Sequence, residues 1–226
     1  MPTSQNLALF DLDHTLLPLD SDHEFGEFLI SQGLADAETY RRRNDGFYQQ
    51  YCNGTLVLDE YIAFTTSIWR EMTEADQHAL QQAFMAQVIL PALQPQALDL
   101  VEAHRAQGDL IAIVTATNEF VTRPIAQAFN VDHLIAVRLV RDGAGRVTGQ
   151  IDGVPSFRAG KITRVEQWLA DQGRHLDQFE RVSFYSDSPN DLPLLERATH
   201  PVATNPSAEL EAVAQERGWR ILRLFA

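Results

Sequence analysis

Two aspartates stand directly behind a short apolar run near the start of the chain. Asp11 and Asp13 follow residues 7–10, which predict a buried strand. Alternation along an extended chain points side chains two positions apart to the same side. Ligands of open α/β sheets bind beyond the carboxyl ends of the strands, so the pair is placed where it can meet a substrate. One carboxylate can attack while the other transfers protons.

Later segments carry the other polar groups that such a reaction needs. Each stands near the end of a predicted strand (110–115 and 182–186) or the start of a predicted helix, and they are Thr115, Lys161, Asp187, Asn190 and Asp191. An aspartate pair behind a strand also fits a turn whose side chains accept bonds from nearby N–H groups. The occurrence of all these groups in one order favours a reaction centre over several unrelated structural roles.

The segment after Thr115 offers a place for an anion. Residues 115–118 lead into a helix that the pattern predicts over 118–129. The first N–H groups of a helix have no partner within it, and they attract negative charge. We therefore expect Thr115 and the amide of Ala116 beside a bound phosphate. A strand-end hydroxyl bonded to a neighbouring amide is the simpler alternative.

Lys161 lies where a positive charge is unfavourable. The first turn of a helix carries a partial positive charge, so a cation there costs roughly 0.3–1 kcal/mol. Bound phosphate or Asp191 would compensate for this, whereas a solvated surface lysine would need no compensation. Capping explains part of the last motif, because Ser188 and Pro189 fit an N-cap and a first helical position. It leaves Asp187 without a structural role.

In this order the motifs resemble those of the haloacid dehalogenase (HAD) superfamily, in particular its phosphoserine phosphatase-like members of subclass IB. The similarity extends from Asp11 to Asp191 and includes residues 129–161. It implies a Rossmann-like core, an α-helical cap of the C1 type after the first motif, and Mg²⁺-dependent hydrolysis of phosphate monoesters. Asp13 favours phosphate chemistry over dehalogenation, because a halide leaves without a proton.

The resemblance also implies a role for each polar residue. Asp11 is expected to attack phosphorus and form an aspartyl-phosphate, and Asp13 to protonate the leaving alkoxide and later activate water. The carboxylates of Asp11 and Asp187 and the backbone carbonyl of Asp13 are the expected Mg²⁺ ligands. The residues expected to hold the phosphoryl oxygens or to orient the other groups are Thr115, Ala116, Lys161, Asn190 and Asp191.

Cap residues are expected to choose the leaving group. In phosphoserine phosphatases a glutamate and an arginine of the cap bind the charged ends of the amino acid, and Glu24 and Arg70 are the candidate counterparts. Asp20 and Asp22 favour a cationic or hydroxyl-bearing leaving group, unless Asp22 only caps a helix. Histidinol phosphate and phosphoserine are the leading substrates. A phosphotransferase with the same intermediate and a non-catalytic phosphometabolite-binding or scaffold module are the alternative functions.

Composition is typical of a compact soluble enzyme, and the resemblance implies that its partner is a small phosphorylated metabolite. The 226 residues are 45% hydrophobic, enough for one core and a modest insertion. Cys52 is the one cysteine, which excludes an internal disulfide. A net charge of −13 opposes a nucleic-acid partner, and no apolar stretch reaches the roughly 20 residues of a membrane span. The first residues lack signal-peptide features, so we expect a cytoplasmic protein, and no particular oligomeric state is indicated.

Helix and strand patterns divide the chain into two parts. A helical period fills 17–90 without a convincing strand, whereas strands and helices alternate after 91. The expected fold is α/β, with a Rossmann-like, mostly parallel sheet, helices on both faces, a β-hairpin and an inserted helical cap. We expect residues 1–16 and 91–226 to form the catalytic core and 17–90 a cap that acts as a lid. Further predicted elements are a hairpin of 135–141 and 146–151, a helix over 162–170, strands over 201–204 and 220–225, and a helix with Pro206 at its first position.

Overall fold

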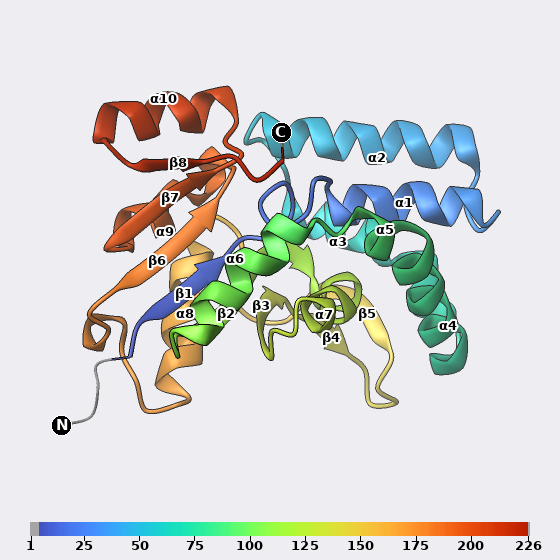
Figure 1. Ribbon diagram of the computed structural model, residues 1–226. Helices are drawn as coiled ribbons and strands as arrows, with labels where there is room; N and C mark the ends of the chain where they lie inside the picture. The colour runs from blue at the N-terminus through green and yellow to red at the C-terminus, as the bar shows by residue number, and fades with distance from the viewer. Residues whose placement is uncertain (1–4, 226) are drawn as a thin grey trace.

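The centre of the protein is a six-stranded parallel sheet. The computed structural model describes residues 5–225, and its strands lie in the order β3-β2-β1-β6-β7-β8 (Figure 1). Every neighbouring pair in this sheet runs parallel. The strands are β1 (Leu7–Phe10), β2 (Leu110–Asn118), β3 (His133–Val137), β6 (Val182–Ser186), β7 (His200–Thr204) and β8 (Arg220–Leu222).

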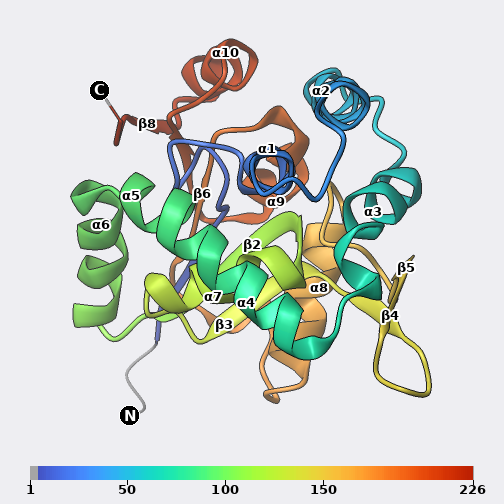
Figure 2. The same ribbon diagram turned by 90° about the vertical axis from the view of Figure 1, so that its right-hand side faces the viewer.

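Helices cover both faces of the sheet, as its apolar strands require. Leu7 and Leu9 of β1 pack into one buried cluster and Ala8 and Phe10 into another, because side chains alternate along a strand. One face carries α6 and α7, and the other carries α8, α9 and α10 (Figures 1 and 2). These helices are α6 (Pro95–Ala106), α7 (Glu119–Ala128), α8 (Gly160–Ala170), α9 (Leu192–Arg197) and α10 (Ala208–Arg217). The expected α/β fold is confirmed.

The sheet changes its direction of growth between β1 and β6. It extends from β1 through β2 to β3 on one side, and from β6 through β7 to β8 on the other. Ligand sites of open α/β sheets lie beyond the carboxyl ends of the strands at such a switch point. The register pairs Phe10 with Tyr185, so the residues that follow the two strands, Asp11 and Asp187, leave the sheet almost side by side.

A helical insertion separates β1 from β2 and lies beyond the carboxyl ends of the strands (Figure 1). Between residues 11 and 109 the structure contains no strand, as the sequence predicts. Its elements are α1 (Ser21–Ser31), α2 (Ala37–Cys52), α3 (Leu58–Thr66), the 3₁₀ turn η1 (Trp69–Glu71), α4 (Glu74–Phe84), the π-helical turn η2 (Met85–Ile89) and α5 (Leu90–Ala92). Within 5–225, no helix is long and apolar enough to cross a membrane.

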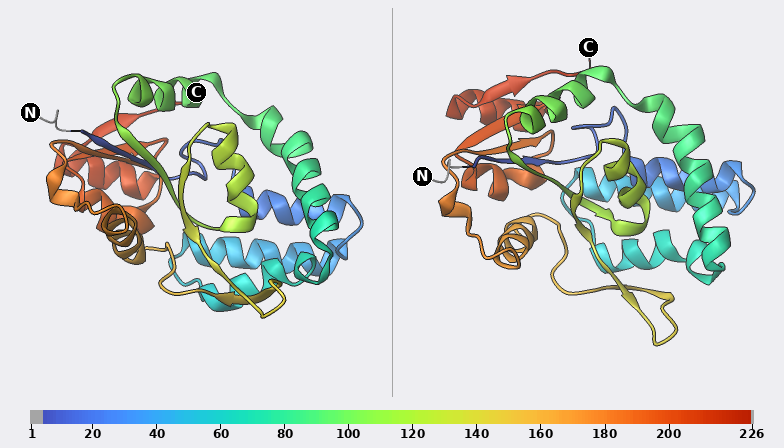
Figure 3. Two further views of the ribbon diagram at one scale, coloured as in Figure 1. Left: turned by 90° about the horizontal axis from the view of Figure 1, so that it is seen from below. Right: turned by 60° about the horizontal axis from the view of Figure 1, so that its bottom comes forward.

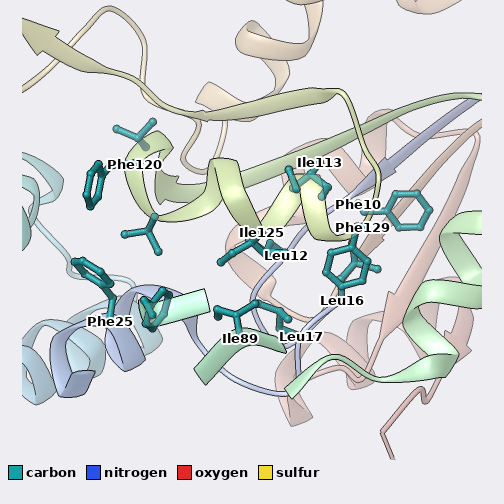
Figure 4. Packing of buried hydrophobic residues seen from close by; sticks show 14 of the residues in the cluster. Phe10, Leu12, Leu16, Leu17, Phe25, Ile89, Ile113, Phe120, Ile125 and Phe129 are labelled. Carbon is teal, nitrogen blue, oxygen red and sulfur yellow. The ribbon is translucent and has the colours of Figure 1, made fainter. Parts of the chain in front are cut away.

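The insertion and the sheet share one apolar core. Phe25 of α1 and Ile89 of η2 lie beside α7, from which Phe120 and Ile125 extend, and all four belong to one buried cluster (Figure 4). Trp69 of η1 stacks on Phe120 with the ring centroids 3.8 Å apart. Apolar packing therefore anchors the insertion to the first helix that follows β2.

The predicted hairpin differs from the observed one. The segment 135–141 is divided, because β3 pairs with β2 in the main sheet and only β4 (Leu139–Arg141) pairs with β5 (Val147–Ile151). The hairpin projects from the sheet alongside the insertion, where β5 packs against α3 (Figure 3). The apolar residues of one continuous run thus serve two different sheets.

Three element boundaries also differ from the predictions. Strand β2 continues past Thr115 to Asn118, because its last residues still pair with β3. Pro206 precedes helix α10 rather than opening it, since Ser207 is the N-cap and its hydroxyl accepts the N–H of Leu210. Strand β8 ends at Leu222, short of the predicted end at 225.

Candidate active site

Asp11 and Asp187 face each other at the switch point of the sheet. The N–H of Asp11 donates to the carbonyl of Tyr185 at 2.9 Å, which continues the pairing of β1 with β6. The hydroxyl of Thr15 lies 3.3 Å from an oxygen of each carboxylate and accepts the N–H of Asp187 at 3.1 Å. One short loop therefore holds two carboxylates from distant parts of the sequence against a single hydroxyl.

Lys161 links two carboxylates in the interior. Its Nζ donates to Asp11 at 2.8 Å and to Asp191 at 2.7 Å, and its side chain is only 2% exposed. The hydroxyl of Ser186 also donates to Asp191, at 2.8 Å. Asp191 therefore compensates the charge of Lys161 in the first turn of α8. It stands at the N-cap position of α9, but its side chain makes no capping hydrogen bond there. Ser188 is the N-cap of the turn η4 (Pro189–Asp191).

Both carboxylate oxygens of Asp13 are fixed. The N–H of Ser21 donates to one oxygen at 2.7 Å, and the hydroxyl of Thr117 donates to the other at 2.9 Å. Thr117 was not among the predicted site residues. Its position two residues after Thr115 on one strand would have indicated it, had the strand been predicted to extend far enough.

The region after Thr115 departs from the predicted anion site. Thr115 and Ala116 line the pocket, and the Thr115 hydroxyl accepts the N–H of Thr117 at 3.1 Å. Helix α7 begins only at Glu119, and the buried side chain of Asn118 accepts the N–H groups of Phe120 and Val121. Two N–H groups at the start of the helix are thus already bonded to Asn118, whereas the sequence predicts that these groups are free to bind an anion.

Burial shapes the electrostatics of the acidic groups. Burial raises the pKa of Asp11, which Lys161 opposes, and burial together with Asp11 and Asp191 raises the pKa of Asp187 well above its ordinary value. Burial raises the pKa of Asp191 to about 6 against the effect of Lys161. Burial alone would lower the pKa of Lys161, but Asp11 and Asp191 raise it above its usual value. The cluster carries excess negative charge that a cation would neutralise.

The donors at this site suit a hard divalent cation. Asp11 and Asp187 present carboxylate oxygens around one hydroxyl, and Mg²⁺ prefers oxygen ligands. Among residues 5–225, no group of three or more carboxylate, imidazole or thiol side chains is arranged to hold a metal ion. Mg²⁺ commonly binds through one or two carboxylates plus substrate and water oxygens, so the two carboxylates fit this ion.

A pocket lies between the sheet and the insertion. Its empty space is about 560 Å³, part of which is open to solvent. Asp11, Asp13 and Asp187 line it from the sheet. The insertion contributes aromatic residues and acids to the wall, and they are Phe47, Tyr48, Tyr51, Tyr61, Asp20 and Asp22. Within the described part of the chain, no lysine or arginine lines this pocket. The wall is therefore aromatic and negatively charged.

The four predicted cap residues divide into two pairs. Asp20 and Asp22 line the pocket, and Asp20, rather than Asp22, caps α1 by accepting the N–H groups of Asp22 and His23. Glu24 and Arg70 do not line it. Arg70 instead donates to the carbonyl of Thr148 on β5, because η1 faces the hairpin. The structure thus does not bring Glu24 and Arg70 to the pocket.

Asn190 contacts the insertion and is not among the pocket-lining residues. Its Nδ2 donates to the carbonyl of Tyr51 at 3.2 Å, and its Oδ1 accepts from Arg158 at 3.3 Å. Arg158 also donates to the carbonyl of Gly54. Sequence patterns did not indicate Arg158 or Tyr51, because each contact depends on how the insertion packs on the sheet.

One asparagine ties the end of the chain to the loop after β1. His14 has a left-handed backbone, with φ of 55°, and its carbonyl accepts from Asn205 Nδ2 at 3.0 Å. The same group donates to the carbonyl of Thr15 at 3.2 Å. Oδ1 of Asn205 accepts the N–H groups of Leu224 and Phe225. Asn205 therefore braces the loop that carries Asp11 and Asp13.

Comparison with known proteins supplies the family. The model of the haloacid dehalogenase-like hydrolases matches residues 8–196. The chain belongs to this family. It is 41% identical over 218 residues to a histidinol-phosphatase of Neisseria meningitidis serogroup C (strain 8013), covering 96% of this chain and 98% of that protein. The sequence-based expectation of a HAD hydrolase is confirmed.

Two solved structures show the same fold in this HAD hydrolase. A protein of unknown function from Bordetella pertussis Tohama I has a TM-score of 0.93 and 50% identity, covering 99% of this chain and 100% of that chain. A substrate-bound phosphoserine phosphatase has a TM-score of 0.68, covering 97% of this chain and 93% of that chain. Its identity is only 15%, so it supports the fold alone.

Proposed function

We propose that the protein is a Mg²⁺-dependent phosphatase that hydrolyses a small phosphate monoester through an aspartyl-phosphate on Asp11. The observation that carries the proposal is the buried cluster in which Lys161 joins Asp11 to Asp191 while Thr15 joins Asp11 to Asp187. Family membership and the identity to a histidinol-phosphatase support it. Residues 1–16 and 91–226 are the proposed catalytic core, and 17–90 the proposed cap.

Asp11 is suited to attack phosphorus. Lys161 fixes one of its oxygens, so the carboxylate has a defined orientation. Asp11 and Asp187, with the backbone carbonyl of Asp13, would hold the Mg²⁺ ion, whose charge neutralises the phosphate. A bond forms between Asp11 and phosphorus as the ester oxygen leaves. The phosphoryl oxygens are assigned to Lys161 and to the Thr115 and Ala116 region.

Asp13 is suited to move the protons. Burial and the nearby charge of Asp20 raise its pKa to about 6, close to the range in which a carboxyl group can both give and accept a proton near neutral pH. In the first step Asp13 protonates the leaving alkoxide. In the second it accepts a proton from the water that cleaves the aspartyl-phosphate, and Asp11 is regenerated.

The leaving-group side of the pocket favours a cationic alcohol. Asp20 supplies negative charge, and a bound ammonium would favour the charged form of Asp22, whose pKa burial raises to about 8. Aromatic faces such as those of Tyr48 and Tyr61 also attract cations. A carboxylate on the leaving group would find no lysine or arginine among the described lining residues, which offer it only the imidazole of His14. Histidinol phosphate carries an ammonium and an imidazole without a carboxylate, so we propose it, rather than phosphoserine, as the substrate.

The experiment is a measurement of phosphate release by the purified protein with Mg²⁺. We expect kcat/KM for histidinol phosphate to exceed that for phosphoserine by about 100-fold or more, because an uncompensated buried charge costs several kcal/mol. Asp11→Asn is expected to abolish turnover of both esters. Equal values for the two esters would contradict the substrate assignment. Absence of Mg²⁺-dependent turnover over a broad panel of phosphate esters would contradict the proposed function itself.

A further inference from the structure

The insertion brings one tyrosine to the catalytic aspartates. Tyr51, near the end of α2, lines the same pocket as Asp11, Asp13 and Asp187. It lies far from every motif in the sequence, and the mechanism described above gives it no task. A side chain that reaches a reaction centre from a separate element needs contacts that hold it there.

Core residues hold Tyr51 from two directions. Its carbonyl accepts from Asn190 Nδ2 at 3.2 Å, and its ring lies beside that of Phe157 with the centroids 6.3 Å apart. Arg158 donates to Asn190 Oδ1 at 3.3 Å and also to the carbonyl of Gly54, which follows α2. We call Arg158, Asn190 and Gly54 the clasp. It fixes the end of α2 against the loop that precedes α8, the helix of Lys161, and against the turn η4, which follows Asp187.

Arg158 adopts a costly conformation to make these contacts. Its φ of 51° is in the left-handed region, which costs a residue other than glycine of order 1–3 kcal/mol. Its guanidinium also lies over the Phe157 ring, 4.8 Å from the centroid. Hydrogen bonds and ring contact together offset the backbone cost. The geometry is therefore specific to the clasp and is not that of a solvated arginine.

The Tyr51 hydroxyl remains a hydrogen-bond donor in this environment. Burial raises its pKa well above 10, and the charges of Asp11, Asp191 and Asp187 raise it further. A group that keeps its proton cannot act as a base, but it can donate to an oxygen that gains negative charge. In a buried site such a donor, fixed before the reaction begins, stabilises the transition state.

We propose that Tyr51 is a further catalytic residue, which donates a hydrogen bond from the insertion to the phosphoryl group in transfer, and that Arg158 is a positioning residue acting through Asn190. The inference rests on the proposed function. The bond from Asp11 to phosphorus forms and the ester bond breaks as described above. Tyr51 keeps its proton throughout.

The first test is Tyr51→Phe, which removes the hydroxyl but keeps the ring and the backbone carbonyl. We expect kcat to fall about 10–100-fold on every ester, whatever the pKa of its alcohol, because the contact is with the phosphoryl group. Tyr40→Phe is the matched control, since Tyr40 is buried on the same helix but does not line the pocket. An unchanged kcat, or a loss that grows with the pKa of the alcohol, would overturn the assignment.

The second test is a double-mutant cycle of Tyr51→Phe with Arg158→Gln. If Arg158 acts by placing the hydroxyl, Arg158→Gln should lower kcat much less in the Tyr51→Phe background than in the wild type. Additive losses would overturn the positioning role. Arg158→Lys, which keeps the charge without the planar fork, replaces Arg158→Gln if melting shows that the latter does not fold.

The two proposals fail in different ways. An active wild-type protein with an unaffected Tyr51→Phe variant contradicts the role of Tyr51 and leaves the proposed function standing. A wild-type protein that releases no phosphate from any ester in the presence of Mg²⁺ contradicts both.

Discussion

The two sides of the pocket differ in how completely their buried polar groups are bonded. On the sheet side, Asp11 and Asp191 share Lys161, and Asp13 accepts from Ser21 N–H and Thr117. Within residues 5–225, every buried side-chain polar atom without a hydrogen-bond partner belongs to the insertion, and these atoms are in Ser21, Asp22, Thr65 and Trp69. Asp22 is the one among them that lines the pocket.

The difference corresponds to two functions: the groups on the sheet side carry out the reaction, and those on the insertion side select the substrate. A buried polar group left without a partner costs about 1–3 kcal/mol, so such groups are uncommon unless something binds them. Groups on the sheet side serve a reaction that is the same for every phosphate ester, and the protein itself positions them. Asp22 retains a carboxyl oxygen without a hydrogen-bond partner, and we expect the ammonium of a substrate to bond it.

The largest effect should come from the sheet side, where Asp13 is expected to protonate the leaving group. Asp13→Asn should lower kcat/KM for alkyl phosphates by about 10²–10⁴-fold, because kcat/KM reports the step in which the alcohol leaves and not the later attack of water. The loss in kcat/KM should be much smaller for p-nitrophenyl phosphate, because nitrophenolate leaves without a proton. Steady-state measurements on both esters check this prediction, and an equal loss of kcat/KM on the two would contradict the role of Asp13 as the acid.

A smaller and more selective effect is expected on the insertion side. Asp22→Asn should reduce the preference for histidinol phosphate over its deamino analogue by about 10–100-fold, the range of a hydrogen bond to a charged group. Rates on the deamino analogue itself should change little. The comparison needs kcat/KM for both esters in each variant.

Asp20→Asn is the matched control for this preference. One carboxylate oxygen of Asp20 accepts the N–H groups of Asp22 and His23, and asparagine caps helices equally well. The preference should therefore survive in Asp20→Asn better than in Asp22→Asn. A larger loss in Asp20→Asn would move the recognition of the ammonium from Asp22 to Asp20.

The smallest effect that we expect is on the free energy of unfolding of the protein when no metal is bound. Burial, with Asp20 nearby, raises the pKa of Asp22 to about 8 from an ordinary value of 3.8. The folded protein therefore binds this proton more tightly than the unfolded chain, and the free energy of unfolding falls as pH rises from about 4 to about 8. Melting temperatures in chelator should show this decline.

The part of the decline that belongs to Asp22 can be isolated. Burial raises the pKa of Asp13 and of Asp191 to about 6. The loss of stability that these two groups cause as pH rises is therefore largely complete by about pH 6. Asp22→Asn should flatten the decline between about pH 6 and 8. Glu38→Gln, which removes an equal charge from a side chain that is 89% exposed, should not flatten it. Parallel curves for Asp22→Asn and wild type would refute the assignment.

The parts of the molecule that sequence predicts well are those set by local patterns. Asp11 and Asp187 end apolar runs, and the ends of neighbouring parallel strands meet at one edge of a sheet, so their encounter follows from the fold. Thr117 was missed because a polar sequence continued a strand that was expected to stop. Gly160 and Gly218 fall near predicted boundaries of helices, and those helices were found.

Sequence patterns did not predict the contacts between elements that are distant in the chain. Nothing local to Arg158 or Tyr51 indicates that they meet across Asn190, because that contact requires α2 to end over the loop before α8. The same holds for Arg70, whose charge suggested a substrate contact but whose turn lies against β5. Side-chain chemistry indicates what a residue can bind, whereas packing decides what it reaches.

Asn205 makes the shape of the catalytic loop depend on residues that lie outside the pocket. Its side-chain amide joins the carbonyls of His14 and Thr15 to the amides of Leu224 and Phe225, so residues distant in the sequence brace the loop that carries Asp11 and Asp13. Neither Leu224 nor Phe225 lines the pocket. A change that displaces these two residues would therefore loosen the catalytic loop without altering any group that a substrate touches.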